Sequence, residues 1–265
     1  MTSREIALWS GPSTRDPAMR PVDLTDSGAV ESALAADDPA VVIHAAAVST
    51  ADRAVREPRL AHAVNVLATG RIADWCVGRG RRLILVSTDL VFDGRASWRR
   101  EQDPAHPILE YGRTKRAAEQ LLDGRPGCLS ARLSLLYGPT PCKRPSFFDQ
   151  AMGTLRAGIP QAFFIDEYRT PLDYASAAAA LVALALSDMS GLVHVGGPER
   201  LSRFDLMRRA AQALGVDPRL VLANQLRDAV FPEPRPADVS LDSSLLVATF
   251  PSTSRPKIEQ ALEAP

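Results

Sequence analysis

Short apolar runs alternate with helical patterns along the first half of the chain, and this alternation limits the fold more than any other feature. Val41–Ala45, Leu83–Ser87 and Leu129–Leu136 are runs dominated by aliphatic residues, without strict polar alternation. Between them, apolar residues recur every three or four positions, as on one face of a helix. Strands that are buried on both faces and separated by helices form a parallel sheet with helices on either side. We therefore expect an α/β protein with a doubly wound parallel sheet.

The pattern changes near residue 138. Ahead of that point the spacing of apolar residues predicts three helical regions, over 27–36, 51–80 and 111–122. After it the alternation loosens, and an alanine-rich helix over 171–187 is the clearest later element. We expect a main sheet domain over 1–138. A smaller α/β lobe is expected over 139–265, with segments that return to the main sheet.

Charge and cysteine content limit the partners of the chain. Among its 265 residues, 31 basic and 31 acidic side chains cancel, so no bulk attraction to nucleic acid or to an anionic membrane surface is expected. No run approaches the roughly 18 apolar residues of a membrane-spanning helix. The three cysteines are far apart and form no Cys-x-x-Cys pair. We therefore expect no disulfide framework, no metal site and a reducing, cytoplasmic location.

Tyr111 and Lys115 lie four residues apart in a predicted helix, which places them on one face. An ammonium group beside a phenol favours the phenolate, so Lys115 is expected to lower the pKa of Tyr111. Tyr111 then becomes a general acid that can protonate a carbonyl oxygen while hydride arrives at carbon. The same spacing also arises by chance at the start of surface helices, and spacing alone leaves that alternative open.

Thr88 follows the run Leu83–Ser87, at the expected carboxyl end of a parallel strand. Ligands of open α/β sheets bind at that edge. A hydroxyl at this point can hydrogen-bond the carbonyl oxygen that Tyr111 would protonate. The alternative is a loop hydroxyl that satisfies a nearby backbone group.

The segments around these residues resemble the extended short-chain dehydrogenases/reductases. The resemblance rests on STDLVFDG at 87–94, YGRTKRAAE at 111–119, VIHAAA at 42–47 and RLSLLYGP at 132–139. Within that family the pattern is most similar to the dTDP-4-dehydrorhamnose reductase type. The resemblance implies a Rossmann-like fold and NADP or NAD as cofactor. It also implies reduction of a keto group on a nucleotide-activated sugar.

The resemblance assigns roles to three groups of residues. The catalytic group is Thr88, Tyr111 and Lys115. Cofactor contacts are implied for Asp23, Leu24, Ala45, Ala46, Ala47, Asn65, Tyr111 and Lys115, and Asn65 would also brace the active-site helix. Substrate contacts are implied for Thr88, Asp89, Val91, Tyr137 and Arg169. Ser10 and Arg15, after the first predicted strand, favour NADP over NAD.

The family has a glycine-rich turn between its first strand and a helix, where the backbone approaches the pyrophosphate of the cofactor. No GxGxxG or GxxGxxG is present near the start of this sequence, and the first predicted strand is Glu5–Trp9. One strand–helix unit of about 25–30 residues is therefore expected to be missing. Three explanations stay open: a gene start set too late, a Glu5–Trp9 strand moved into the central position, and a strand from another chain. We expect the first for the gene. For the chain as it stands we expect a central Glu5–Trp9 strand and weakened cofactor binding.

Other functions on the same fold are kept as alternatives. A regulatory or binding protein similar to the methionine adenosyltransferase beta subunit would explain the missing glycine turn. An epimerase or dehydratase fits less well. The resemblance implies that dehydratases of the family carry acidic residues directly after the catalytic hydroxyl residue, and here only Asp89 follows Thr88. The family resemblance also makes a homodimer plausible, through helices near 60–78 and 111–122. His44 is expected to be a core histidine whose hydrogen bonds are satisfied.

Overall fold

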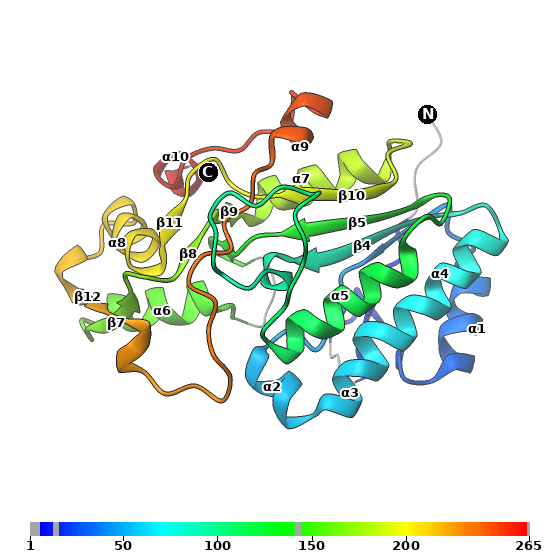
Figure 1. Ribbon diagram of the computed structural model, residues 1–265, viewed down its shortest axis with the longest axis horizontal. Helices are drawn as coiled ribbons and strands as arrows, with labels where there is room; N and C mark the ends of the chain where they lie inside the picture. The colour runs from blue at the N-terminus through cyan, green and yellow to red at the C-terminus, as the bar shows by residue number, and fades with distance from the viewer. Residues whose placement is uncertain (1–5, 13–15, 141–144, 264–265) are drawn as a thin grey trace.

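The computed structural model describes residues 6–12, 16–140 and 145–263. Its centre is a four-stranded parallel sheet in the order β10–β5–β4–β3 (Figure 1). The strands are β3 (Val41–His44), β4 (Arg82–Thr88), β5 (Cys128–Leu133) and β10 (Gly191–Val195). The buried runs predicted from sequence thus lie side by side, and the parallel sheet is confirmed.

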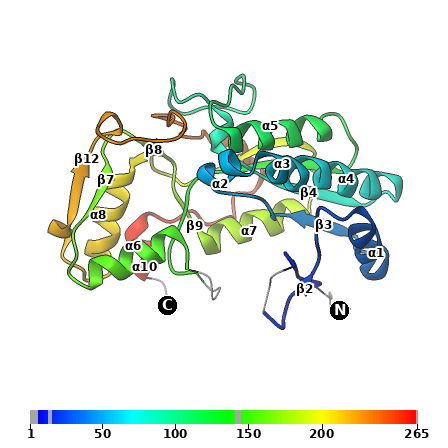
Figure 2. The ribbon, with the colours of Figure 1, turned by 90° about the horizontal axis from the view of Figure 1, so that it is seen from below.

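Helices cover both faces of this sheet. One face packs against α1 (Ser27–Asp37), α4 (Ala68–Gly78) and α5 (Glu110–Leu122), and the other against α7 (Tyr174–Ala185). Figure 2 shows α4 and α5 on one side of the strands and α7 on the other. Each face has its own buried apolar cluster, with Leu85 of β4 in one and Ile84 in the other. Successive side chains of a strand point to opposite faces of the sheet, so neighbouring residues join different clusters. The two covered faces confirm the doubly wound architecture.

The helical region predicted over 51–80 forms as several helices that follow one another along the chain. It consists of α2 (Ala51–Arg56), α3 (Pro58–His62), a π-helical turn (Ala63–Leu67) and α4. Pro58 has no backbone N–H and is tolerated only in the first turn of a helix, so the helix restarts there. Asp26 caps the first helix, because its side chain accepts hydrogen bonds from the N–H groups of Gly28 and Ala29 in the first turn of α1.

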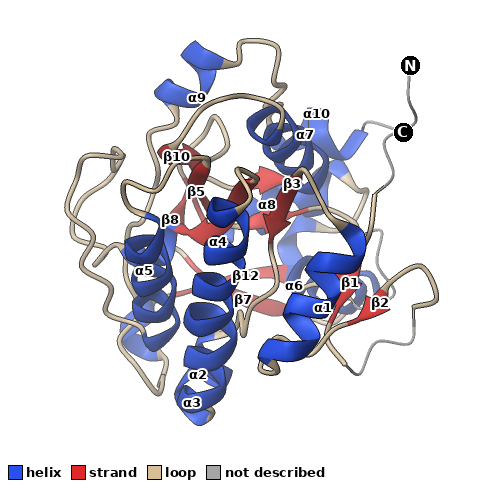
Figure 3. Ribbon diagram, turned by 90° about the vertical axis from the view of Figure 1, so that its right-hand side faces the viewer, coloured by secondary structure: helices blue, strands red, loops and turns tan. Residues whose placement is uncertain are grey.

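The first strands of the chain lie apart from the main sheet. β1 (Trp9–Ser10) pairs in parallel with β2 (Arg20–Pro21), and this two-stranded sheet forms no ladder with β3 (Figures 2 and 3). The expected central Glu5–Trp9 strand is therefore wrong, and Glu5 itself lies outside the described residues. The indole Nε1 of Trp9 donates to Asp37 Oδ2 at 2.7 Å, and Arg20 pairs with the same oxygen at 2.7 Å. These contacts hold β1 and β2 against the C-terminal end of α1, where Asp37 lies.

The second half of the chain adds a smaller group of elements. Its strands are β6 (Leu136–Tyr137), β7 (Gln161–Phe164), β8 (Tyr168–Arg169), β9 (Leu172–Asp173), β11 (Leu201–Ser202) and β12 (Val221–Asn224). Its remaining helices are α6 (Phe147–Arg156), α8 (Arg203–Ala213), α9 (Ser244–Thr249) and α10 (Ile258–Glu263). α6, α8, α10, β7 and β12 share one apolar cluster. Within the described ranges, no helix combines the length and the apolar character needed to cross a membrane.

Candidate active site

A hydroxyl and a carboxylate follow each other at the carboxyl end of β4. Thr88 ends the strand, and its Oγ1 accepts a hydrogen bond from the Leu90 N–H at 3.2 Å. The same hydroxyl donates to Asp89 Oδ1 at 3.2 Å. Asp89 is buried and also accepts from Ser134 Oγ at 3.0 Å. These bonds fix the direction of the Thr88 hydroxyl at the sheet edge where ligands of this fold class bind.

Arg169, a substrate candidate, lies behind this edge and is 4% exposed. Its Nη1 donates to Asp89 Oδ1 at 2.7 Å and its Nη2 to Glu167 Oε1 at 3.0 Å. Burial alone would lower the pKa of Arg169, but the two carboxylates raise it. Only its Nε lacks a partner among the described residues. Arg169 thus holds Asp89 in place from strand β8.

Tyr111 is the second residue of α5 and is partly exposed, and its phenol lies near enough to Thr88 and Asp89 for both to influence its pKa. Burial and the Asp89 carboxylate raise the pKa of Tyr111 to about 12, although Thr88 and Arg169 act in the opposite direction. The lowering by Lys115 that the spacing predicted is not found, because burial dominates. The phenol therefore keeps its proton at neutral pH, as a proton donor must.

Lys115 lies one helical turn after Tyr111 and is 1% exposed. Burial lowers the pKa of its ammonium group to about 8, and the charge of Glu119 opposes this shift. Its side chain has no hydrogen-bond partner in the described part of the chain. A buried ammonium group without hydrogen bonds is costly, so this side chain suits a ligand that brings oxygen acceptors.

Glu119 is a buried site residue that the sequence reasoning missed. It lies one further turn along α5 and is 1% exposed. Its carboxylate accepts from Ser87 Oγ at 2.6 Å, from Arg132 at 2.9 and 2.8 Å, and from Arg116 at 3.1 Å. The four-residue spacing from Lys115 was the available signal, because it places both side chains on one helix face.

Asn65 joins the loop after β3 to α5. Its Oδ1 accepts from the Val48 N–H at 2.8 Å. Its Nδ2 donates to the Val48 carbonyl at 3.2 Å and to Thr114 Oγ1 at 2.9 Å. The side chain is fully buried, so both hydrogens and the oxygen of the amide are used inside the protein.

The end of β3 is open at the same sheet edge. Ala45 and Ala46 are exposed and Ala47 is partly buried, so small side chains leave this edge accessible. His44 is buried just before them, and burial and the charge of Lys115 lower its pKa to about 3. Its Nε2 has no hydrogen-bond partner among the described residues. The expectation of a satisfied core histidine is therefore wrong.

The remaining candidates lie in three different places. Asp23 and Leu24 follow β2, where Asp23 accepts from the backbone and hydroxyl of Thr25 at 2.9 and 2.7 Å. Val91 is fully buried in an apolar cluster with Phe92, Val239 and Leu241. Tyr137 is 1% exposed, and its ring lies 6.1 Å from that of Phe148. The structure thus brings Thr88, Asp89, Tyr111, Lys115 and Arg169 together but keeps Val91 and Tyr137 inside apolar clusters.

The nicotinamide-ribose end of a cofactor fits the residues of this site. The unpartnered ammonium of Lys115 and the open edge at Ala45–Ala47 suit ribose hydroxyls and a close approach. The pyrophosphate finds no matching place, because no glycine-rich turn opens a helix beside β3 in the described ranges. Ser10 ends β1, whereas Arg15, the other NADP candidate, lies outside the described residues. The residues present would therefore suit the reactive end of the cofactor, and no matching place for its phosphates is seen among the described residues.

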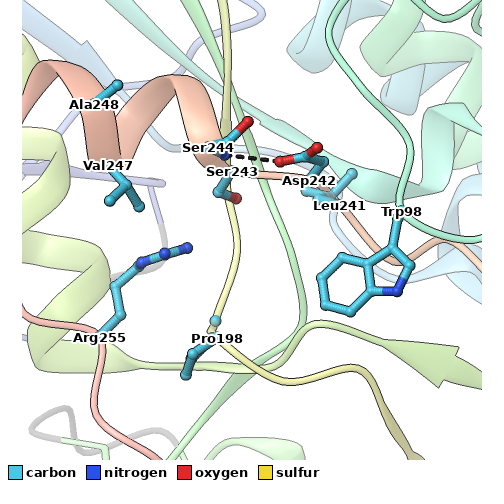
Figure 4. A pocket seen from close by; sticks show the side chains of 10 residues that line it. Trp98, Pro198, Leu241, Asp242, Ser243, Ser244, Val247, Ala248 and Arg255 are labelled. Carbon is cyan, nitrogen blue, oxygen red and sulfur yellow. Dashed lines mark hydrogen bonds between the residues drawn. The ribbon is translucent and has the colours of Figure 1, made fainter.

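Two surface hollows lie away from these residues. One of about 370 Å³ is lined by Trp98, Asp242 and Arg255 among others, and the Ser244 N–H donates to Asp242 at 2.8 Å (Figure 4). The other, of about 520 Å³, is lined by residues of the segment 226–235. Neither includes Thr88, Tyr111 or Lys115. Across the residues that can be described, no three His, Cys, Asp or Glu side chains are grouped to hold a metal ion.

Comparisons with known proteins point to one family. The family model described as "RmlD substrate binding domain" matches residues 5–264. The chain is 32% identical over 255 residues to the probable low-salt glycan biosynthesis reductase Agl14 of Haloferax volcanii, covering 95% of this chain and 85% of that protein. It is 33% identical over 226 residues to a dTDP-4-dehydrorhamnose reductase of Mycolicibacterium smegmatis, covering 83% and 68%. Methionine adenosyltransferase 2 subunit beta of Xenopus tropicalis is 30% identical over 249 residues, covering 90% and 73%.

Solved structures agree with this result. A hypothetical dTDP-4-dehydrorhamnose reductase from Sulfolobus tokodaii superposes with a TM-score of 0.85 at 26% identity, covering 100% of this chain and 93% of that one. A dTDP-4-dehydrorhamnose reductase from Bacillus anthracis in complex with NADP has a TM-score of 0.82 at 22% identity, covering 92% and 88%. The second likeness supports the fold alone.

Proposed function

The chain belongs to the RmlD substrate-binding-domain family, and from this premise we propose that it is an NAD(P)H-dependent reductase of a keto group on a nucleotide-activated sugar. The observation that supports this most directly is the cluster of Thr88, Tyr111 and Lys115 at the carboxyl edge of the sheet. A protein that only bound a partner would have no need for these three side chains together.

The chain's own residues suggest how a carbonyl group would be reduced. A bound nicotinamide cofactor would supply the hydride. Tyr111 keeps its proton at neutral pH and would donate it to the carbonyl oxygen. Asp89 accepts a hydrogen bond from the Thr88 hydroxyl and so orients that group, which would face the same carbonyl oxygen. The positive charges of Lys115 and Arg169 would stabilise the phenolate left after proton transfer.

A regulatory or binding protein is the second candidate. It is supported by the absence of a described place for the pyrophosphate and by the similarity to methionine adenosyltransferase 2 subunit beta. Such a protein would bind a nucleotide or a partner chain without turnover. The two candidates therefore differ in activity and not in fold.

The test is reduction of a dTDP-4-keto sugar with NADPH by the wild-type chain and by Tyr111→Phe. We expect the variant to lose about 10²- to 10⁴-fold in kcat while its circular dichroism and melting temperature stay the same. Tyr168→Phe is the matched control, because Tyr168 lies in β8 with Arg200 over its ring at 3.7 Å. Equal rates for wild type and Tyr111→Phe would contradict the reductase. Ligand binding without turnover by the wild type would favour the second candidate.

Three finer assignments belong to the same proposal. Residues 1–138 would form the cofactor domain and 139–265 the substrate lobe. NADP would be preferred to NAD, and comparative titration with the two reduced cofactors measures that preference. A homodimer would form through the helices near 60–78 and 111–122, where Leu67 and Leu121 are 45% and 36% exposed. Size-exclusion chromatography with light scattering tests the dimer.

A further inference from the structure

The hollow beside α9 is built from segments that are far apart in the chain. It is lined by Trp98, by Gly197 and Pro198, by residues of the segment 241–248 and by Arg255. Figure 4 shows Trp98 on one side of it and Arg255 on the other. Its volume of about 370 Å³ lies at the lower end of the range in which proteins bind small molecules.

Hydrogen bonds connect the walls of this hollow to one another. The Trp98 N–H donates to Ser240 Oγ at 2.8 Å, and the Gly196 N–H donates to Ser243 Oγ at 2.8 Å. Arg255 Nη1 donates to the Gly196 carbonyl at 2.9 Å. The loop that carries Trp98, the turn after β10 and the segment that leads into α9 are therefore held in place. A binding site needs walls that are fixed in this way.

Trp98 has a backbone conformation that its side chain does not favour. Its φ is 54°, in the left-handed region, where a bulky residue is rare. Asp38, the other described residue besides glycine with a positive φ, ends α1 with a short polar side chain that suits such a place. Burial does not account for Trp98, because its side chain is 44% exposed. Strained residues of this kind cluster at ligand sites, which favours a role for the exposed indole.

The hollow also offers one donor group and one acceptor group. Arg255 Nε and Nη2 have no hydrogen-bond partner among the described residues, since only Nη1 is used within the protein. Asp242 accepts from the Ser244 N–H at 2.8 Å through Oδ1. Its Oδ2 lies 3.3 Å from Arg100 Nε, but the side chain of Arg100 is 64% exposed, and such a pair contributes little. The Asp242 carboxylate can therefore accept from a ligand.

These groups together select one class of ligand. A simple anion would be attracted by Arg255 and repelled by Asp242, and a simple cation would meet the reverse. A neutral ring with several hydroxyl groups avoids both penalties, because each hydroxyl can donate to a carboxylate and accept from a guanidinium group. The C–H groups on the face of a sugar ring carry small positive partial charges, which suit the negative face of an indole. A neutral monosaccharide has both properties.

We propose that this hollow is a binding site for a neutral monosaccharide ring, separate from the candidate active site. The indole of Trp98 stacks on the ring, while Asp242 accepts from its hydroxyl groups and Arg255 donates to them. Neither the catalytic candidates nor the open edge at Ala45–Ala47 contributes to the hollow. The proposal therefore does not depend on the proposed function, and it holds or fails whether or not the chain is a reductase.

The first experiment titrates the full chain with the methyl glycosides of D-glucose, D-mannose and L-rhamnose. The three tryptophans give three indole N–H signals in a proton–nitrogen NMR spectrum, and Trp98→Phe identifies the signal of Trp98 by its loss. We expect that signal to move with a dissociation constant of about 1–10 mM for at least one glycoside, while those of Trp9 and Trp75 stay in place. No movement at about 100 mM of any glycoside would overturn the proposal. Tighter binding of glucose 6-phosphate or of cyclohexanol would also overturn it, because an anion or a merely apolar ring would then be preferred.

A second experiment tests the polar walls with variants. Arg255→Met removes the donor, and Asp242→Asn removes the charge while keeping an oxygen for the Ser244 N–H. We expect each to raise the dissociation constant about tenfold or more, with the melting temperature as the check on folding. Arg100→Met is the matched control, because Arg100 approaches the same carboxylate without lining the hollow, and binding should not weaken. Unchanged affinity in Asp242→Asn, which preserves the size of the side chain, would overturn the proposal, as would equal weakening by Arg100→Met.

Discussion

Glu119 and Arg132 form a doubly hydrogen-bonded ion pair between helix α5 and strand β5, with N–O distances of 2.9 and 2.8 Å. Their side chains are 1% and 2% exposed. Burial would raise the pKa of Glu119, but the hydrogen bonds and charge of Arg132 lower it. Arg132 also approaches His194 of β10, with 3.4 Å between Nη1 and Nε2. The helix that carries Tyr111 and Lys115 is thus tied to the sheet by a buried charged network.

Breaking this pair should destabilise the protein strongly. Arg132→Met leaves the Glu119 carboxylate buried without its main partner, and we expect the free energy of unfolding to fall by about 3–5 kcal/mol. Arg125→Met is the control, because Arg125 and Asp74 pair at 2.6 Å but are 34% and 70% exposed, so about 0–1 kcal/mol is expected. Urea unfolding measures both. Losses of similar size would contradict a special role for the buried pair.

Gly112 should not tolerate alanine. A Cβ at this position would lie 2.2 Å from the Leu90 carbonyl oxygen, which belongs to the backbone and cannot rotate away. We expect Gly112→Ala to push α5 off the Asp89–Val91 turn, with a loss of about 1–3 kcal/mol in unfolding free energy and reduced reductase activity. Gly153→Ala in α6 meets no atom within 4 Å and should stabilise by about 0.5–1 kcal/mol. Comparable melting temperatures for the two variants would refute the steric argument.

Acid should weaken the fold before its carboxylates titrate. Burial lowers the pKa of His44 to about 3 and, with Arg132, that of His194 to about 4, from an ordinary value of 6.5. The unfolded chain therefore binds more protons than the folded one below pH 6.5. Unfolding free energy should fall by up to about 1.4 kcal/mol per pH unit for each histidine between pH 6.5 and 4.5.

Urea titrations at several pH values in that window measure the slope. His44→Leu should reduce it by about half, since one of the two buried histidines is then gone. His106→Ala should leave it unchanged, because His106 is exposed. A slope that persists undiminished in His44→Leu would mean that other groups cause the acid sensitivity.

Glu233 should act as a remote cap for α5. Its carboxylate accepts from the Glu110 N–H at 2.9 and 3.1 Å, while Leu109 at the cap position has no side chain able to accept. We expect Glu233→Ala to cost about 1 kcal/mol in unfolding free energy, as loss of a helix cap usually does. Glu57→Ala is the comparison, because Glu57 stands between α2 and α3, caps no N–H group with its side chain and pairs with Arg53 at an exposed site, so it should matter by less than about 0.5 kcal/mol. No difference between the two would rule out a capping role.

The periodicity of the sequence was sufficient to predict α1, the helical path from α2 to α4, α5 and α7, and three of the four strands of the main sheet. Apolar spacing depends on 3.6 residues per turn in helices and on two-faced burial in strands, and both are local properties of the chain. The face shared by Tyr111, Lys115 and Glu119 follows from the same spacing. The cap at Asp26 is local as well, because its acceptor lies within three residues of the N–H groups that it binds.

Tertiary structure alone decided which distant side chains meet. Arg169 reaches Asp89 across 80 residues, and Glu233 caps a helix that begins 123 residues earlier. The same holds for β1 and β2, whose place beside α1 depends on contacts of Trp9 and Arg20 with Asp37. Such pairings depend on the order in which strands are laid side by side and on what each one buries. Neither is encoded in the spacing of nearby residues, because many chain paths satisfy the same local pattern and only packing selects among them.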